Sequence, residues 1–116
     1  MNTRRQIRQL AAADPRLLEL GDIQVVTRRR DCNHVQRRKQ QRAIGDSMIL
    51  VALGYGNRFY ARGALHFKLG DRHLRGTPYA RFTDALRGLT VVCQSREPHP
   101  AILTTYWDWD IKRRAR

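Results

Sequence analysis

The spacing of apolar residues is helical within the first twenty positions of the chain. Ile7, Leu10 and Ala11 fall on one face at the spacing of an amphipathic helix. Asp14 before Pro15 is typical of a helix start, because a carboxylate caps free backbone N–H groups and proline suits the first turn. This pattern predicts one or two short helices, with the arginines of the segment on a solvated face.

Two short elements are predicted next. The letters IQVV at 23–26 suit a strand that ends in a basic loop. From 32 to 43 the composition is helical, and Asp31 or Asn33 is in place to cap that helix.

A nearly continuous apolar run follows at 48–53, within IGDSMILVALGYG. Such a run suits either a buried strand or a buried helix. We favour a helix because Asp46 is placed as its cap and Ile44 as a staple on its first turn. Gly54 or Gly56 is expected to end it in the left-handed conformation.

From Asn57 onward the apolar period becomes two, which predicts strands. In NRFYARGALHFKLG, Gly63 is expected to mark a bulge or bend within one run. One face would then carry Phe59, Ala61, Leu65, Phe67 and Leu69, and the opposite face Arg58, Tyr60, Arg62, His66 and Lys68. After a charged connection (GDRHLRGTP), YARFTDALRG predicts a short helix.

The last third predicts two more strands, GLTVVCQS and AILTTYWDW, joined by the turn REPHP as an antiparallel hairpin. A polar, basic tail with frayed structure is expected at 111–116. Helices that cluster before strands indicate an α+β fold, with helices packed on one side of a small curved antiparallel sheet. We expect an N-terminal helical arm at 1–22 and a single domain at 23–110.

Charge is the strongest bulk feature: 23 Lys and Arg against 10 Asp and Glu give a net charge of +13 in 116 residues. Arginine dominates, and guanidinium groups bind phosphate bidentately and stack on bases. Nucleic acid is the partner that such a field favours, although an acidic protein or a merely solvated surface would also fit. No apolar run of about 18 residues and no leader pattern is apparent, so we expect no membrane span, no secretory signal and a cytoplasmic protein. Cys32 and Cys93 are expected to be reduced thiols.

One predicted helix carries a cationic stripe. In HVQRRKQQRAI, His34, Arg38 and Arg42 lie one turn apart on the same face. No acid stands at a compensating position within this helix, so the cations repel one another unless an anion is bound. Solvated or hydrogen-bonded side chains are the alternative interpretation. An imidazole exchanges protons near neutrality, which suits acid–base chemistry.

The same letters resemble the opening motif of the uncharacterised domain family DUF 4258, which reads His-x-x-x-Arg-x-x-x-Arg-Gly-Ile. His34, Arg38, Arg42 and Ile44 match it, and Ala43 departs from its glycine. The similarity extends over 23–107, through the apolar helix, the basic strand around Arg62 and the strand ILTTY. It implies a fold similar to the RelE/barnase-like ribonuclease toxins, many of which cut RNA without a metal and are held by an antitoxin.

Metal-free RNA cleavage needs a base, cations at the phosphate and an acid. The candidate catalytic residues are His34, Arg38, Arg62 and Tyr106, and the candidate nucleic-acid-binding residues are Arg42, Tyr60, His66 and Lys68. Packing or a solvated sheet face competes as an explanation for the strand residues. The histidines lack metal-ligand spacing, so we expect neither a metal nor another cofactor.

The sequence therefore predicts a metal-independent ribonuclease of toxin type that acts on RNA. Two alternatives stay open: a non-catalytic nucleic-acid-binding module, and a protein-interaction module bound by an acidic antitoxin or immunity protein.

Overall fold

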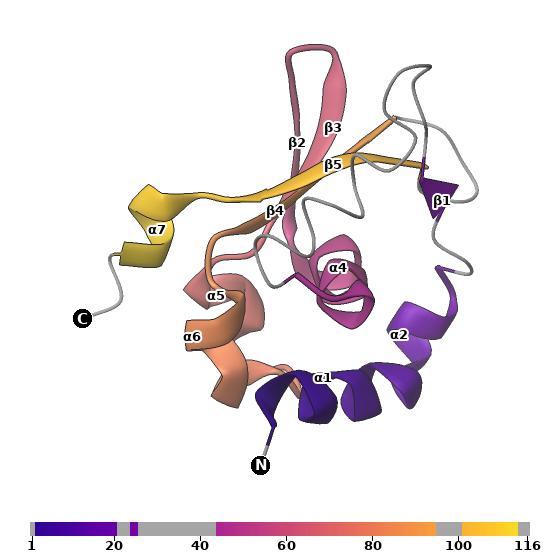
Figure 1. The fold of residues 1–116 in the computed structure, drawn as a ribbon, viewed down its shortest axis with the longest axis vertical. Coiled ribbons are helices and arrows are strands. Elements are labelled where there is room, and N and C mark those ends of the chain that lie inside the picture. The colour runs from indigo at the N-terminus through magenta and orange to yellow at the C-terminus, as the bar shows by residue number, and fades with distance from the viewer. Residues whose placement is uncertain (1, 21–23, 26–43, 95–100, 114–116) are drawn as a thin grey trace.

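The computed structural model describes residues 2–20, 24–25, 44–94 and 101–113 (Figure 1). Two helices open the chain, α1 (Thr3–Ala12) and α2 (Pro15–Leu18). The Asn2 side chain accepts hydrogen bonds from the backbone N–H groups of Arg4 and Arg5 and so caps α1. Asp14 caps α2, where its Oδ1 accepts from Arg16 N at 2.9 Å. The prediction of one or two N-terminal helices is confirmed: there are two, and the second begins at Asp14 and Pro15 as expected.

The strands form one sheet in the order β1-β5-β4-β3-β2. Its members are β1 (Gln24–Val25), β2 (Asn57–Ala61), β3 (Ala64–Lys68), β4 (Leu89–Gln94) and β5 (Ala101–Trp107). β1 runs parallel to β5, while β2 to β5 are antiparallel. The predicted α+β class and the antiparallel pairing of the last two strands are confirmed.

The long apolar run forms a helix, as predicted, and it lies at the centre of the molecule. α4 (Asp46–Tyr55) packs between the sheet and α1 (Figure 1). Its cap is Gly45, because Asp46 is already the first helical residue. The predicted left-handed ending is wrong: Gly56 has extended backbone (φ −73°, ψ 162°), since the chain passes directly into β2. A Cβ at Gly56 would lie 2.6 Å from the Ala52 carbonyl oxygen, which explains the glycine.

β2 and β3 form a hairpin rather than one bent strand. Arg62 and Gly63 are the two residues of its turn, and both have positive φ (52° and 75°), as in a type I′ turn. The turn pairs Ala61 with Ala64 and thereby Phe59 with His66. The predicted division of side chains between the two faces is therefore wrong, because paired residues of an antiparallel hairpin share a face.

Three short helical segments connect β3 to β4: α5 (Asp71–Leu74), the 3-10 helix η1 (Ala80–Phe82) and α6 (Thr83–Leu86). The last two confirm the short helix predicted there, whereas α5 lies in what was expected to be a plain connection. Arg87 joins these segments, because its guanidinium binds the carboxylates of both Asp71 and Asp84. These ion pairs raise the pKa of Arg87 and lower that of Asp71.

The last described element is α7 (Trp109–Arg113), which covers part of the segment 111–116 where a frayed tail was expected. Asp108 starts this helix, because its Oδ1 accepts hydrogen bonds from the backbone N–H groups of Asp110 and Ile111.

The core lies between the helices and one face of the sheet. It includes Ile7 and Leu17 from the N-terminal helices, Val51 from α4, and Val91 and Ile102 from the sheet. α1 and α2 thus contribute to the same core as the strands. Cys93 is a buried free cysteine, and burial raises the pKa of its thiol to about 12. In the described part of the chain, no helix has the length and apolar character needed to cross a membrane.

Candidate nucleic-acid interface

A groove lies on the face of the sheet opposite the core. The register places His66 beside Phe59 and Val92, and Thr104 beside Val92, so these side chains share that face. The groove has a volume of about 610 Å³, and we call it the outer groove. It is lined by Phe59, Ala61, Arg62, Ala64, His66, Lys68, Val92, Leu103, Thr104 and Tyr106.

The middle of the outer groove is held by two stacked rings. Phe59 and His66 have ring centroids 5.0 Å apart and planes inclined by 22°. His66 is only 8 % exposed, and its Nδ1 lies 3.2 Å from the Ala64 carbonyl oxygen. A carbonyl oxygen can only accept, so this contact requires the proton on Nδ1. Nε2 is then the ring nitrogen that can accept a proton.

One end of the outer groove carries a paired cation. Lys68 Nζ lies 2.7 Å from Asp108 Oδ2 and 5.5 Å from the centroid of the Phe59 ring. The Lys68 hydrogen bond, together with the backbone N–H groups of α7, holds the pKa of Asp108 below its usual value. Lys68 is therefore fixed in position, and part of its charge is neutralised.

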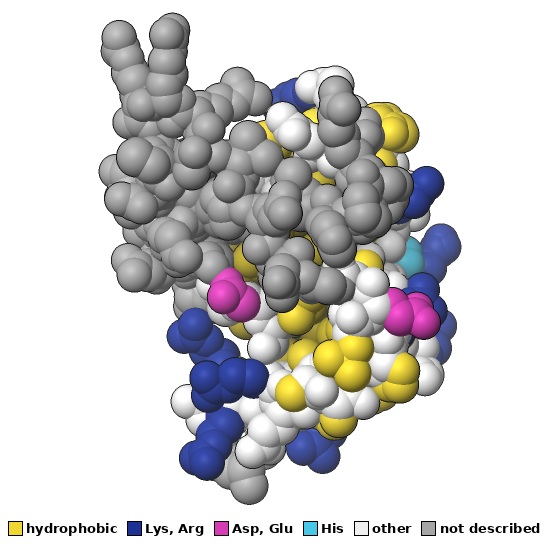
Figure 2. Space-filling model, turned by 90° about the vertical axis from the view of Figure 1, so that its right-hand side faces the viewer, with side chains coloured by type: hydrophobic (Ala, Val, Ile, Leu, Met, Phe, Trp, Pro, Cys, Tyr) yellow, Lys and Arg dark blue, Asp and Glu magenta, His cyan; other side chains and the backbone are white. Residues whose placement is uncertain are grey.

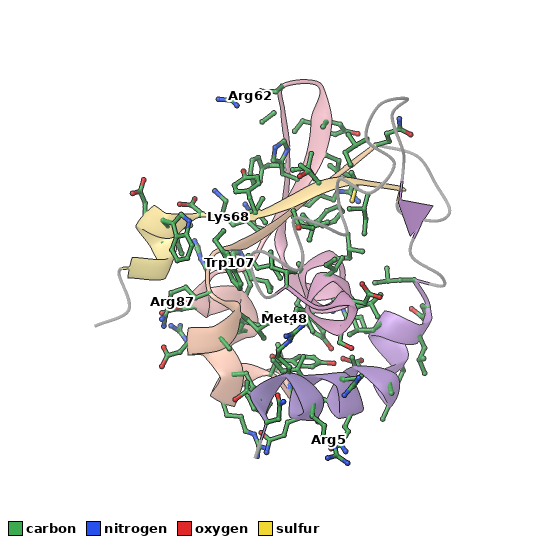
Figure 3. All side chains as sticks on the ribbon, viewed as in Figure 1. Arg5, Met48, Arg62, Lys68, Arg87 and Trp107 are labelled. Atoms are coloured by element: carbon green, nitrogen blue, oxygen red, sulfur yellow. The ribbon has the colours of Figure 1, made fainter. Side chains whose placement is uncertain are left out.

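The other end carries Arg62, at the tip of the β2–β3 hairpin (Figure 3). Its side chain is exposed, and no carboxylate among the described residues pairs with it. The left-handed backbone is costly for an arginine, since asparagine or glycine is the usual residue at this turn position. Strain of this kind persists at sites where a particular side chain is needed.

Tyr106 lines the outer groove from β5 and is half-buried. Tyr60 does not line it, although the sequence pattern placed it on the same face as His66 and Lys68. The hairpin pairs Tyr60 with Leu65 and turns it to the other face, where it is 66 % exposed.

The structure thus brings together Arg62, His66, Lys68 and Tyr106 and separates Tyr60 from them. His34, Arg38 and Arg42 lie outside the described residues. Phe59 and Asp108 are site residues that the sequence analysis missed. A two-residue turn at Arg62-Gly63 is the signal that would have predicted the pairing of Phe59 with His66 on one face of the sheet.

Metal ligands do not gather within the described ranges, where no three His, Cys, Asp or Glu side chains are arranged to hold an ion. Comparison of the chain with protein-family models, curated proteins and solved structures found no match. The resemblance to the DUF 4258 family therefore stays a prediction from the motif.

Proposed function

We propose that this protein binds single-stranded RNA in the outer groove and cleaves it without a metal ion. One observation carries the proposal. Four candidate residues from two parts of the sequence line this single groove: Arg62, His66 and Lys68 from the β2–β3 hairpin, and Tyr106 from β5. Helices on one side of an antiparallel sheet are also what a RelE/barnase-like fold would require, and we include that fold assignment in the proposal.

RNA is the ligand that this groove suits best. Proteins that bind single strands combine cations along the backbone with aromatic rings on which bases stack. Arg62 and Lys68 supply positive charge at the two ends of the outer groove. Tyr106, on β5, supplies an aromatic ring in the lining on which a base can stack. The net charge of +13 draws polyanions towards the surface.

Cleavage would use the 2′-hydroxyl of the RNA itself. A base takes the proton of that hydroxyl, its oxygen attacks the phosphorus, and the 5′-oxygen leaves with a proton from an acid. His66 and Tyr106 are the proton-transfer groups that the outer groove offers, and Arg62 is the group to stabilise charge on the phosphorane. His34 remains a candidate for proton transfer, and Arg38 remains a candidate for stabilising charge on the phosphorane.

A second candidate function is RNA binding without cleavage. The burial of His66 and its stacking on Phe59 favour this alternative, because both are typical of a histidine that only supports a binding surface.

Arg62→Asn is expected to change protein stability and RNA binding in opposite directions. The substitution is expected to raise the free energy of unfolding by about 1 kcal/mol, since asparagine tolerates the left-handed turn better. It is also expected to weaken binding of oligouridine RNA and to reduce the slope of log affinity against log salt by about 0.7. Denaturant unfolding and fluorescence anisotropy with a labelled oligonucleotide measure the two effects.

Arg75→Gln is the matched control, because it removes one exposed charge from a residue outside the outer groove. In the same samples, degradation of mixed RNA in EDTA tests cleavage. RNA binding that is equally strong in Arg62→Asn and wild type would exclude this end of the groove from the site. If the wild-type protein binds RNA but leaves it intact, RNA binding without cleavage would be the remaining function.

A further inference from the structure

A second concave surface lies on the helical side of the molecule. One hollow of about 420 Å³ is lined by Asn2, Arg4, Arg5, Arg8, Gly45, Asp46, Ser47 and Met48. A neighbouring hollow of about 320 Å³ is lined by Arg8, Ala11, Ala12, Leu17, Leu18, Ser47 and Leu50. Arg8 and Ser47 line both hollows, so the two adjoin. We call the combined surface the α1–α4 groove.

The first hollow makes one end of the α1–α4 groove basic. Arg4, Arg5 and Arg8 are all exposed, and no carboxylate of a described residue forms an ion pair with any of them. Arg4 and Arg8 are also one turn apart on α1, where like charges repel. Asp46 lines the same hollow, which leaves three cations to one anion there.

The second hollow makes the other end apolar. Leu18 is 63 % exposed beside it, and Leu50 is half-buried in its wall. In Figure 2, basic side chains lie along one edge of the lower part of the described surface, and apolar side chains are exposed nearby. A large exposed leucine next to a concave apolar surface is typical of a contact that is completed by a partner.

From these contacts we infer that an acidic protein segment docks in the α1–α4 groove, with an aliphatic side chain in the apolar end and carboxylates on the arginines. The apolar end argues against RNA, because phosphate gains nothing from leucine and alanine. Bases would need aromatic rings, and neither hollow is lined by one. The concave shape suits a protein segment, such as one turn of an amphipathic helix, better than a flat lipid surface.

This docking surface is separate from the outer groove. α1 lies across α4 from the sheet (Figure 1), and the two grooves share no lining residue. Arg5 extends from α1 away from the sheet (Figure 3). A partner bound here would leave the outer groove open, so the inference stands or fails independently of the proposed RNA site.

The test uses the full chain and a designed helical peptide of about 15 residues as the probe. Leucines at i, i+3 and i+7 form its apolar face, and glutamates flank that face. A peptide of the same composition with scattered leucines is the probe control. Binding is measured by fluorescence anisotropy at moderate salt. We expect the designed peptide to bind the wild-type protein and the scattered peptide to bind at least about tenfold more weakly.

Two variants locate the contact on the protein. Arg5→Gln/Arg8→Gln and Leu18→Asn are each expected to weaken peptide binding about tenfold. Arg72→Gln/Arg75→Gln, the α5 control, removes the same charge from α5 and from the C-cap residue that follows it, and is expected to leave binding nearly unchanged. Circular dichroism confirms that each variant is folded.

Three results would overturn the inference. The designed peptide does not bind the wild-type protein, or the α5 control weakens binding as much as the α1 variant. The third is that Arg5→Gln/Arg8→Gln weakens the affinity of the protein for another ligand more than the α5 control does. That ligand is either oligouridine RNA or vesicles of phosphatidylglycerol and phosphatidylcholine. That outcome would assign the α1–α4 groove to nucleic acid or to lipid instead.

Discussion

Replacing Asp14 with alanine is expected to lower the free energy of unfolding by about 3 kcal/mol. Asp14 is 8 % exposed and does two things. Its Oδ1 caps α2, and its Oδ2 accepts the hydroxyl groups of Tyr55 at 2.7 Å and Tyr79 at 2.9 Å. Alanine would leave two phenol hydroxyls without their acceptor and one helix without its cap. Urea unfolding followed by circular dichroism measures the loss.

The pH dependence of stability gives an independent check on the same cluster. Burial opposes ionisation of Asp14, but hydrogen bonds from Tyr55 and Tyr79 outweigh it and hold its pKa below the usual value. The stabilisation by Asp14 is therefore complete above its unfolded-state pKa of about 3.9 and is lost as pH falls through the lower folded-state value.

Tyr55 acts in the opposite direction. Burial and the hydrogen bond to Asp14 raise the pKa of Tyr55 to about 12. Stability from the neutral phenol is complete below the unfolded-state pKa of about 10 and is lost as pH rises towards 12.

Asp14→Asn is the matched variant, because its amide oxygen can still cap α2 while one acceptor oxygen becomes a donor. It should fall between alanine and the wild type in stability, and its acid-side pH dependence should be flatter. If Asp14→Ala unfolds at the wild-type urea concentration, the buried carboxylate does not hold the helices to the rest of the fold.

His66→Ala is expected to slow RNA cleavage in EDTA by about 100-fold or more, since loss of a general acid or base has effects of this size. RNA affinity should change little, because Arg62, Lys68 and Tyr106 remain in the outer groove. Single-turnover cleavage of a labelled oligonucleotide separates the rate from the affinity.

His73→Ala provides the histidine control. His73 Nδ1 accepts the backbone N–H of Gly70 at 3.1 Å, and His73 does not line the outer groove. Burial and the neighbouring Arg72 lower its pKa, which suits this role as a neutral acceptor. Cleavage at the wild-type rate in His66→Ala would remove His66 from the reaction and leave His34 as the remaining histidine candidate.

Local signals predicted the helical part of the fold well. Asp14 and Pro15 marked the start of α2, and Asp46 and the apolar run marked α4 within one residue. These predictions succeeded because caps and helical periodicity act within a few residues. α5 escaped notice because its four residues are too few to show a period, and its start rests on Gly70 and His73.

The sheet was harder to predict, because one turn decides which side chains share a face. A single strand with a bulge at Gly63 would place Phe59 on the face opposite His66. A hairpin that turns at Arg62-Gly63 places Phe59 and His66 on the same face. An arginine in the left-handed conformation is uncommon, so the sequence favoured a single strand with a bulge over the hairpin. The grouping of His66 with Lys68 survived, since both lie on β3, and Tyr106 joins them only through the pairing of β4 with β3 and β5.

Photocrosslinking tests the central claim that RNA lies in the outer groove. An oligouridine that carries 4-thiouridine is irradiated with the wild-type protein in EDTA, and the modified peptides are mapped by mass spectrometry. We expect adducts on β2, β3 and β5, at Phe59, Lys68 or Tyr106. Adducts on the α1–α4 groove with none on these strands would contradict the claim.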